Sequence, residues 1–125
     1  MFLKTVTAVA LTALALPAFA EGDAAAGEKV FNKCKSCHAV GEGAKNKVGP
    51  MLNGIVGAEA GKVEDFKYSD ALMAKAEEGL VWDEESLTAF LTKPKDYIPG
   101  TKMSFNGLRK EEEIANVIAY MATFE

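Results

Sequence analysis

The sequence predicts a small all-α domain with about four helices. Four segments carry apolar residues at helical spacing, and no segment alternates in the way that a half-buried strand would. The third observation is a short motif, Cys34-Lys35-Ser36-Cys37-His38, which contains both cysteines and the single histidine of the 125-residue chain. We therefore expect helices and long loops arranged around this motif, which is called the cysteine motif below.

Residues 1–20 have the pattern of a secretory signal peptide. Lys4 precedes an apolar run that is poor in charge, and the segment ends in the small-residue pattern Ala18-Phe19-Ala20. A transmembrane anchor is the alternative, but a spanning helix needs about 20 apolar residues and this run is shorter. We expect cleavage after residue 20, which leaves residues 21–125 as one domain.

The first helix of this domain is expected over residues 24–35. Asp23 is a good N-cap, and Phe31 and Cys34 fall on one face at helical spacing. The cysteine motif would then begin at the C-terminal end of the helix. Gly27 lies inside the helix, at a cost of about 1 kcal/mol relative to alanine. It either permits another helix to approach closely or is a tolerated surface residue.

The rest of the chain is predicted to form loops and three further helices. Residues 41–61 contain six glycines and a proline with few periodic apolar residues, which indicates a long loop. Residues 99–107 form a second loop. The helices are expected over residues 70–78, 84–91 and 110–123, with Ser69 and Asp83 as N-caps and Gly79 and Pro94 as terminators.

The cysteine motif has the spacing of a covalent haem-attachment site. Each thiol can add across one porphyrin vinyl group, and the next residue can place an imidazole nitrogen on the iron. A disulfide would close a tiny loop and stabilise little, a thioredoxin-like site expects a βαβ context, and a zinc site needs a fourth ligand. We expect one haem c on Cys34 and Cys37, with His38 on the iron and a backbone carbonyl near Pro50 accepting its ring N–H.

The sixth iron ligand has to be sought among the methionines, because His38 is the only histidine. Met121 lies on the apolar stripe of the last helix, which favours a core position. Met73 lies on a short helix, which favours a core or surface position. Met51 is close to the cysteine motif, whereas Met103 lies in an irregular loop that can aim its sulfur at a point. The residues alone favour Met103 and leave the others as alternatives.

The charge distribution argues against nucleic-acid binding. Without residues 1–20 the domain has 13 basic and 18 acidic residues, a net charge of −5. Locally the charge is +3 over residues 32–47, −6 over residues 59–85 and +4 over residues 93–110. A basic patch around the cofactor would steer an acidic partner to that side, the alternative being ordinary solvated lysines. The candidate docking residues are Lys33, Lys35, Lys45, Lys47, Lys93, Lys95 and Lys102.

The chain resembles the class I c-type cytochromes, the family of bacterial cytochromes c2 and mitochondrial cytochrome c. The resemblance covers nearly all of residues 21–125, and its motifs are specific only in combination. They are Gly27 and Phe31 with the cysteine motif, Val48-Gly49-Pro50-Met51-Leu52-Asn53-Gly54, Trp82, Tyr97-Ile98-Pro99-Gly100-Thr101-Lys102-Met103-Ser104-Phe105 and Ile118-Ala119-Tyr120.

The resemblance implies a role for several single residues. Met103 would be the sixth iron ligand, and the Pro50 carbonyl would hold His38. Gly27 and Phe31 would pack the first helix across the last one, near Tyr120. Tyr68 and Trp82 would reach the haem propionates. Thr101 would lie in the polar network beside the methionine ligand.

Three departures from the family pattern concern the haem surroundings. The chain has Ala58 where the family usually has an arginine near a propionate, and Phe90 where many relatives have a tyrosine near the methionine sulfur. Residues 72–78 form a longer segment than in the shortest relatives and lack the usual asparagine. These departures leave the haem potential open and do not affect the expected ligation.

The resemblance also implies the function. We expect a soluble, monomeric, periplasmic single-electron carrier without enzymatic activity, nucleic-acid partner or membrane span, whose haem iron cycles between Fe(II) and Fe(III). The donor would be a bc-type quinol-oxidising complex, and the acceptor a photosynthetic reaction centre, a terminal oxidase of a respiratory chain or a denitrification reductase. A haem enzyme would need an open sixth position, and a four-helix-bundle cytochrome carries its motif near the C-terminus.

Overall fold

The computed structural model describes residues 22–125, so the predicted signal peptide lies outside the described residues. This part of the chain contains five helices and, besides one isolated bridge between Glu59 and Val81, no β-structure. The five helices and the lack of strands in this part of the chain confirm the predicted all-α class. None of these helices is long and apolar enough to cross a membrane. The helices are α1 (Ala24–Phe31), α2 (Asp70–Glu77), α3 (Glu84–Thr92), α4 (Pro94–Tyr97) and α5 (Glu111–Ala122).

The helix starts follow the predicted caps. The side chains of Asp23, Ser69 and Asp83 each accept a backbone N–H in the first turn of α1, α2 and α3. Gly79 follows α2 with a φ of 98°, a left-handed conformation that suits glycine. The helices α2 and α3 start where predicted and end within one residue of the prediction, and α5 is one residue shorter than predicted at each end.

Two helix predictions were wrong. The helix α1 ends at Phe31 rather than residue 35, because the next amides bond to carbonyls three residues back, such as Cys34 N–H to Phe31 O at 2.8 Å. The cysteine motif therefore lies in tight turns after the helix. The short helix α4 was not expected. Pro94 does end α3, but proline also suits the first position of a helix, so it begins this extra turn.

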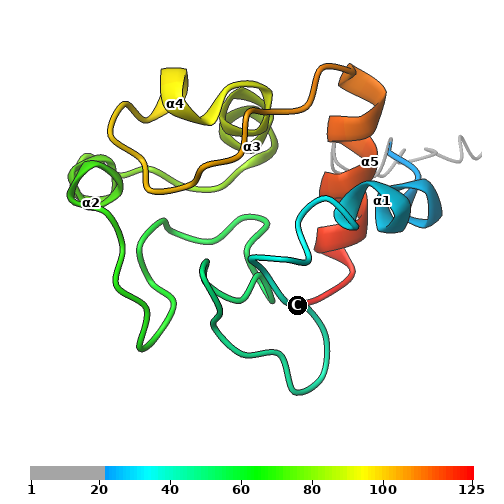
Figure 1. The fold of residues 1–125 in the computed structure, drawn as a ribbon, viewed down its shortest axis with the longest axis horizontal. Helices are drawn as coiled ribbons and strands as arrows, with labels where there is room; N and C mark the ends of the chain where they lie inside the picture. The colour runs from blue at the N-terminus through cyan, green and yellow to red at the C-terminus, as the bar shows by residue number, and fades with distance from the viewer. Residues whose placement is uncertain (1–21) are drawn as a thin grey trace, which may run out of the picture.

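The helices α1 and α5 cross in close contact (Figure 1). A Cβ built on Gly27 would overlap the Asn116 carbonyl oxygen and lie 2.8 Å from the Tyr120 Cβ. The ring centroids of Phe31 and Tyr120 are 5.4 Å apart. The Asp23 N–H also donates to the Asn116 side chain at 2.9 Å. Gly27 is thus the residue of close approach, and the packing near Tyr120 that the resemblance implies is confirmed.

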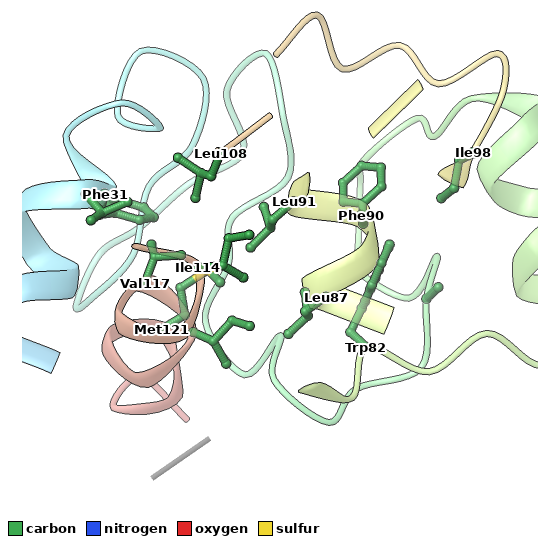
Figure 2. Close-up of a cluster of buried hydrophobic side chains, with 13 residues drawn as sticks. Phe31, Trp82, Leu87, Phe90, Leu91, Ile98, Leu108, Ile114, Val117 and Met121 are labelled. Carbon is green, nitrogen blue, oxygen red and sulfur yellow. The ribbon is translucent and has the colours of Figure 1, made fainter. Parts of the chain in front are cut away.

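The core joins the α1–α5 pair to α3. Figure 2 shows apolar side chains from both groups, and the α3 residues lie beside Trp82. The Trp82 and Phe90 rings have centroids 5.1 Å apart. Met121 is 4% exposed, so its predicted core position is confirmed. The labelled core residues are Phe31, Trp82, Leu87, Phe90, Leu91, Ile98, Leu108, Ile114, Val117 and Met121.

A short backbone ladder holds Trp82 in place. The Trp82 N–H donates to the Ala58 carbonyl at 2.8 Å, and the Trp82 carbonyl accepts the Gly57 N–H at 2.7 Å. The Ala60 N–H donates to the Leu80 carbonyl at 2.9 Å. These bonds fix the end of the long loop against the segment between α2 and α3, although neither segment is regular structure.

Replacing Gly27 with alanine should destabilise the fold, although alanine favours a helix by about 1 kcal/mol. The new methyl group fits only if α1 moves away from α5, and such overpacking typically costs about 1–3 kcal/mol. We expect a lower free energy of unfolding in chemical denaturation. Lys29→Ala, at an exposed position of the same helix, should change it by less than about 0.5 kcal/mol. Unchanged or increased stability of Gly27→Ala would contradict the close crossing.

Candidate cofactor site

His38 is held by a backbone carbonyl of the long loop. Its Nδ1 lies 2.7 Å from the Pro50 carbonyl oxygen. A carbonyl oxygen can only accept, so Nδ1 carries the proton and donates. This tautomer leaves the lone pair of Nε2 free, which is the arrangement that metal-binding histidines have.

The loop reaches His38 because glycine occupies position 49. A Cβ there would overlap the imidazole ring, with its Nδ1 at 2.7 Å and its Nε2 at 2.8 Å. The Gly49 N–H donates to the Cys37 carbonyl at 2.8 Å, and the Leu52 N–H donates to the Ala39 carbonyl at 3.0 Å. The loop therefore runs directly over the cysteine motif, and any side chain at position 49 would push the ring aside.

The surroundings of His38 favour its neutral form. Burial lowers the pKa of the imidazole, and the Lys47 ammonium lowers it further, while the hydrogen bond to Pro50 acts in the opposite direction. The net pKa is below the ordinary value of histidine. A neutral imidazole is the form that ligates a metal ion, so this environment prepares the side chain for that role.

Cys34 and Cys37 are free thiols, and both are half-buried. The disulfide alternative is therefore not present in the structure. Burial raises the pKa of the Cys34 thiol, and so does Cys37, while the Lys33 ammonium lowers it. The net pKa of Cys34 is above its ordinary value, so its thiol form predominates at neutral pH.

Two asparagines that the sequence analysis missed shape the loop. The Asn53 side chain accepts the Gly41 N–H at 2.9 Å and donates to the Gly41 carbonyl at 2.8 Å. The Asn46 side chain accepts the Met51 N–H and donates to the Glu64 carbonyl, both at 2.9 Å. Asparagine in a glycine-rich loop is the one signal that suggests such local bonds, and it does not name their partners.

Met103 lies on the loop between α4 and α5. It is half-buried and packs against the core, and its N–H donates to the Thr101 hydroxyl at 3.2 Å. The Thr101 N–H donates to the carbonyl of Ile98, which is fully buried. Gly100 turns the chain with a φ of 92°. The loop is thus anchored at Ile98 and shaped locally by Thr101.

Tyr68 and Trp82 differ in their burial and in their neighbours. Trp82 is buried in the core, whereas Tyr68 is half-buried and its ring centroid lies 4.8 Å from that of Phe66. The Tyr68 oxygen accepts the Val63 N–H at 3.0 Å, so its own proton is free for another acceptor. Burial raises the pKa of Tyr68, which keeps this proton in place.

The donor set fits a c-type haem. Two free thiols stand three residues apart, and the imidazole that follows them is oriented by Pro50 with one nitrogen free. A half-buried thioether is available on a separate loop. Thiols for covalent attachment, with imidazole and thioether for the iron, are the ligands that cytochromes of this type use.

The seven candidate docking lysines are all exposed, but they are not equivalent. Lys33 pairs with Glu113 at 3.3 Å, and Lys93 lies 3.8 Å from Asp96. The Lys47 ammonium donates to the Lys35 carbonyl at 2.6 Å. The lysines of this set with no ion pair or side-chain hydrogen bond within residues 22–125 are Lys35, Lys45, Lys95 and Lys102.

Phe105 contributes both to the core and to a surface cavity beside two of the candidate docking lysines. It packs against the core cluster. It also lines a cavity of about 280 Å³ together with Lys93, Pro94, Lys95, Asp96 and Asn106. Phe105 therefore faces the same cavity as Lys93 and Lys95.

Comparisons with known proteins find relatives over most of the chain. Residues 24–125 match the family model described as Cytochrome c. The chain is 54% identical over 101 residues to cytochrome c2 of Agrobacterium tumefaciens (strain II Chrys), covering 81% of this chain and 91% of that protein. It is 54% identical over 100 residues to cytochrome c-550 of Ancylobacter novellus, covering 80% and 94%. The solved structure of cytochrome c2 from Rhodospirillum centenum matches with a TM-score of 0.79 at 39% identity, covering 82% and 98%.

Replacing Gly49 with alanine should displace the His38 ring and break its bond to Pro50. Because the new Cβ would meet the imidazole, we expect a loss of about 1–3 kcal/mol in the free energy of unfolding. Val48→Ala is the matched control, since the Val48 side chain is 78% exposed, and it should change stability by less than about 0.5 kcal/mol. Equal effects of the two substitutions would show that the contact with the ring is unimportant.

Proposed function

The chain belongs to the cytochrome c family, and from this membership we propose that it carries single electrons between membrane redox complexes in the periplasm. The family transfers electrons and is not enzymatic, and it binds haem c covalently through cysteines. Cys34 and Cys37 are the two cysteines of this chain, so they are the attachment points that we assign.

We assign His38 and Met103 as the axial ligands of the iron. The observation that carries this assignment is the hydrogen bond from His38 Nδ1 to Pro50, because it leaves Nε2 as the metal-binding atom. Met51 directly follows Pro50, on the side of the ring that is already held, and Met121 is buried in the core. Met103 lies on a separate anchored loop, which supports it as the residue that would supply the second ligand.

The ligand set accounts for transfer without catalysis. Haem c supplies an iron that gains or loses one electron between Fe(II) and Fe(III). His38 and Met103 would both hold the iron, so no position would be open to a substrate, and the hydrogen bond to Pro50 would keep the imidazole fixed. A thioether ligand in apolar surroundings favours the reduced iron and raises the potential. The chain is thus built for rapid transfer at a relatively high potential.

Three polar side chains are assigned to the periphery of the haem. The Tyr68 hydroxyl has a free proton, and the Trp82 indole N–H is a donor on a buried ring that the backbone ladder holds in place. We propose that both donate to the propionates, in the absence of the arginine that Ala58 replaces. The Thr101 hydroxyl, which accepts the Met103 N–H, belongs to the polar surroundings of the sulfur.

The seven candidate docking lysines, called the basic patch here, are assigned as the docking surface for acidic partners. Contacts between exposed charges are weak and are screened by salt, which suits a carrier that must leave its partner.

By family resemblance the donor is a bc-type complex and the acceptor a reaction centre, oxidase or reductase. The signal-peptide pattern of residues 1–20 supports a periplasmic location, and we propose that the carrier acts as a monomer.

Met103→Ala should abolish iron–sulfur ligation. In the oxidised haem-loaded protein we expect a weak far-red sulfur-to-iron absorption band that is lost in this variant. Met51→Ala is the control and should retain the band, because Met51 lies on the histidine side. A high-spin spectrum of the unmodified protein, or a band that survives Met103→Ala, would overturn the assigned ligation.

Charge reversal at an unpaired lysine should weaken electrostatic steering. We expect Lys102→Glu to slow the oxidation of the ferrous protein by the anion ferricyanide several-fold at low salt and to flatten the salt dependence of the rate. Lys75→Glu is the control, because Lys75 lies on α2 in the acidic part of the chain and pairs with Glu78 at 4.0 Å. If both reversals have the same effect, the approach is not directed to the basic patch.

A further inference from the structure

We propose that Met73 is a reversible oxidation site, where a peroxide converts the thioether to a sulfoxide before the other methionines of residues 22–125 react. Met73 is 38% exposed, whereas Met121 is 4% exposed. Met51 and Met103 are half-buried. The susceptibility of a sulfur to oxidation depends on its accessibility, so the order of exposure predicts the order of reaction.

The Met73 sulfur lines an open groove between α2 and the end of the long loop. The groove has a volume of about 260 Å³, and its other lining residues are Glu59, Ala60, Gly61, Lys62, Ala76, Glu77, Gly79 and Leu80. Because a water molecule takes up roughly 30 Å³ in the liquid, a peroxide of two oxygen atoms fits. Gly61 faces the sulfur without a side chain, and a Cβ there would lie 2.9 Å from it.

The reaction balances with hydrogen peroxide as the oxidant. The sulfur of Met73 attacks one peroxide oxygen, the O–O bond breaks and an S–O bond forms. The sulfur loses two electrons, and the second oxygen takes up the proton of the transferred hydroxyl group and leaves as water. The groove carries the carboxylates of Glu59 and Glu77 and the ammonium of Lys62, so a neutral oxidant enters more easily than an anion.

The sulfoxide can be reversed by thiols. A methionine sulfoxide reductase removes the oxygen, which leaves as water while two thiols become a disulfide. The benefit of oxidation at Met73 rests on the proposed function. In that function the sulfur of Met103 must stay a thioether to ligate iron, and a peroxide that reacts at Met73 leaves Met103 intact. A lone pair that is engaged with iron is shielded from peroxide, whereas Met73 is unprotected and can be repaired.

Oxidation should also loosen the groove. The thioether lies against Gly61, where an ideal Cβ would be 2.9 Å from the sulfur and 3.5 Å from the Met73 methyl carbon. A sulfoxide is polar and loses this apolar contact. Gly61 follows Ala60, which is 1% exposed and whose N–H donates to the Leu80 carbonyl. We expect faster hydrogen exchange of the Ala60 amide after oxidation.

The test is a time course of haem-loaded protein with hydrogen peroxide, followed by peptide mass spectrometry. The first added oxygen should be on Met73, several-fold faster than on Met51, Met103 or Met121. Met73→Leu, which conserves volume, should lack this early addition, and Met121→Leu should retain it. A rate at Met73 no faster than at buried Met121, or a first oxygen on Met51 or Met103, would overturn the proposal.

Two further readings separate this proposal from the assigned ligation. The far-red band should persist while Met73 is oxidised, and its loss in step with the first oxygen would disprove the shielding of Met103. A band that is absent before peroxide is added refutes the ligation, whereas the mass spectra still decide the site of oxidation. A sulfoxide reductase with a dithiol should restore the original mass, and failure to do so would disprove reversibility.

Discussion

The hydrogen bond between His38 and the Pro50 carbonyl is the interaction on which the site depends. It selects one tautomer of the ring and leaves the lone pair of the other nitrogen free. The bond requires that the loop pass directly over the ring, which glycine at position 49 permits and the amide bond to the Cys37 carbonyl secures. A backbone carbonyl, rather than a carboxylate, therefore orients the histidine ring.

The α1–α5 crossing supplies the frame for this loop. Gly27 brings the two helix backbones together, and the ion pair between Lys33 and Glu113 at 3.3 Å adds a link from the start of the tight turns to α5. The cysteine motif is consequently anchored to packed helices at one end and covered by irregular chain at the other. Met103 depends on a different anchor, the fully buried Ile98, so the two proposed iron ligands are held by independent parts of the fold.

The predictable features are those that neighbouring residues determine. Asp23, Ser69 and Asp83 were identified as N-caps because capping involves only the next turn of chain. The early end of α1 and the existence of α4 escaped prediction, since periodicity does not distinguish a helix from the tight turns that prolong it. The bonds of Asn46 and Asn53 were missed because their partners lie 5–18 residues away in irregular chain. The position of Met103 in an irregular loop favoured it over the other methionines as the iron ligand, and only the family resemblance singled it out.

The Asn46 link has a consequence for the conditions under which the fold holds together. Its side-chain amide joins the Met51 N–H to the Glu64 carbonyl, so the long loop is connected to the chain that follows it entirely through neutral groups. None of these groups gains or loses a proton between mildly acidic and mildly alkaline pH. The cover over the histidine therefore stays closed when carboxylates elsewhere in the chain change their charge.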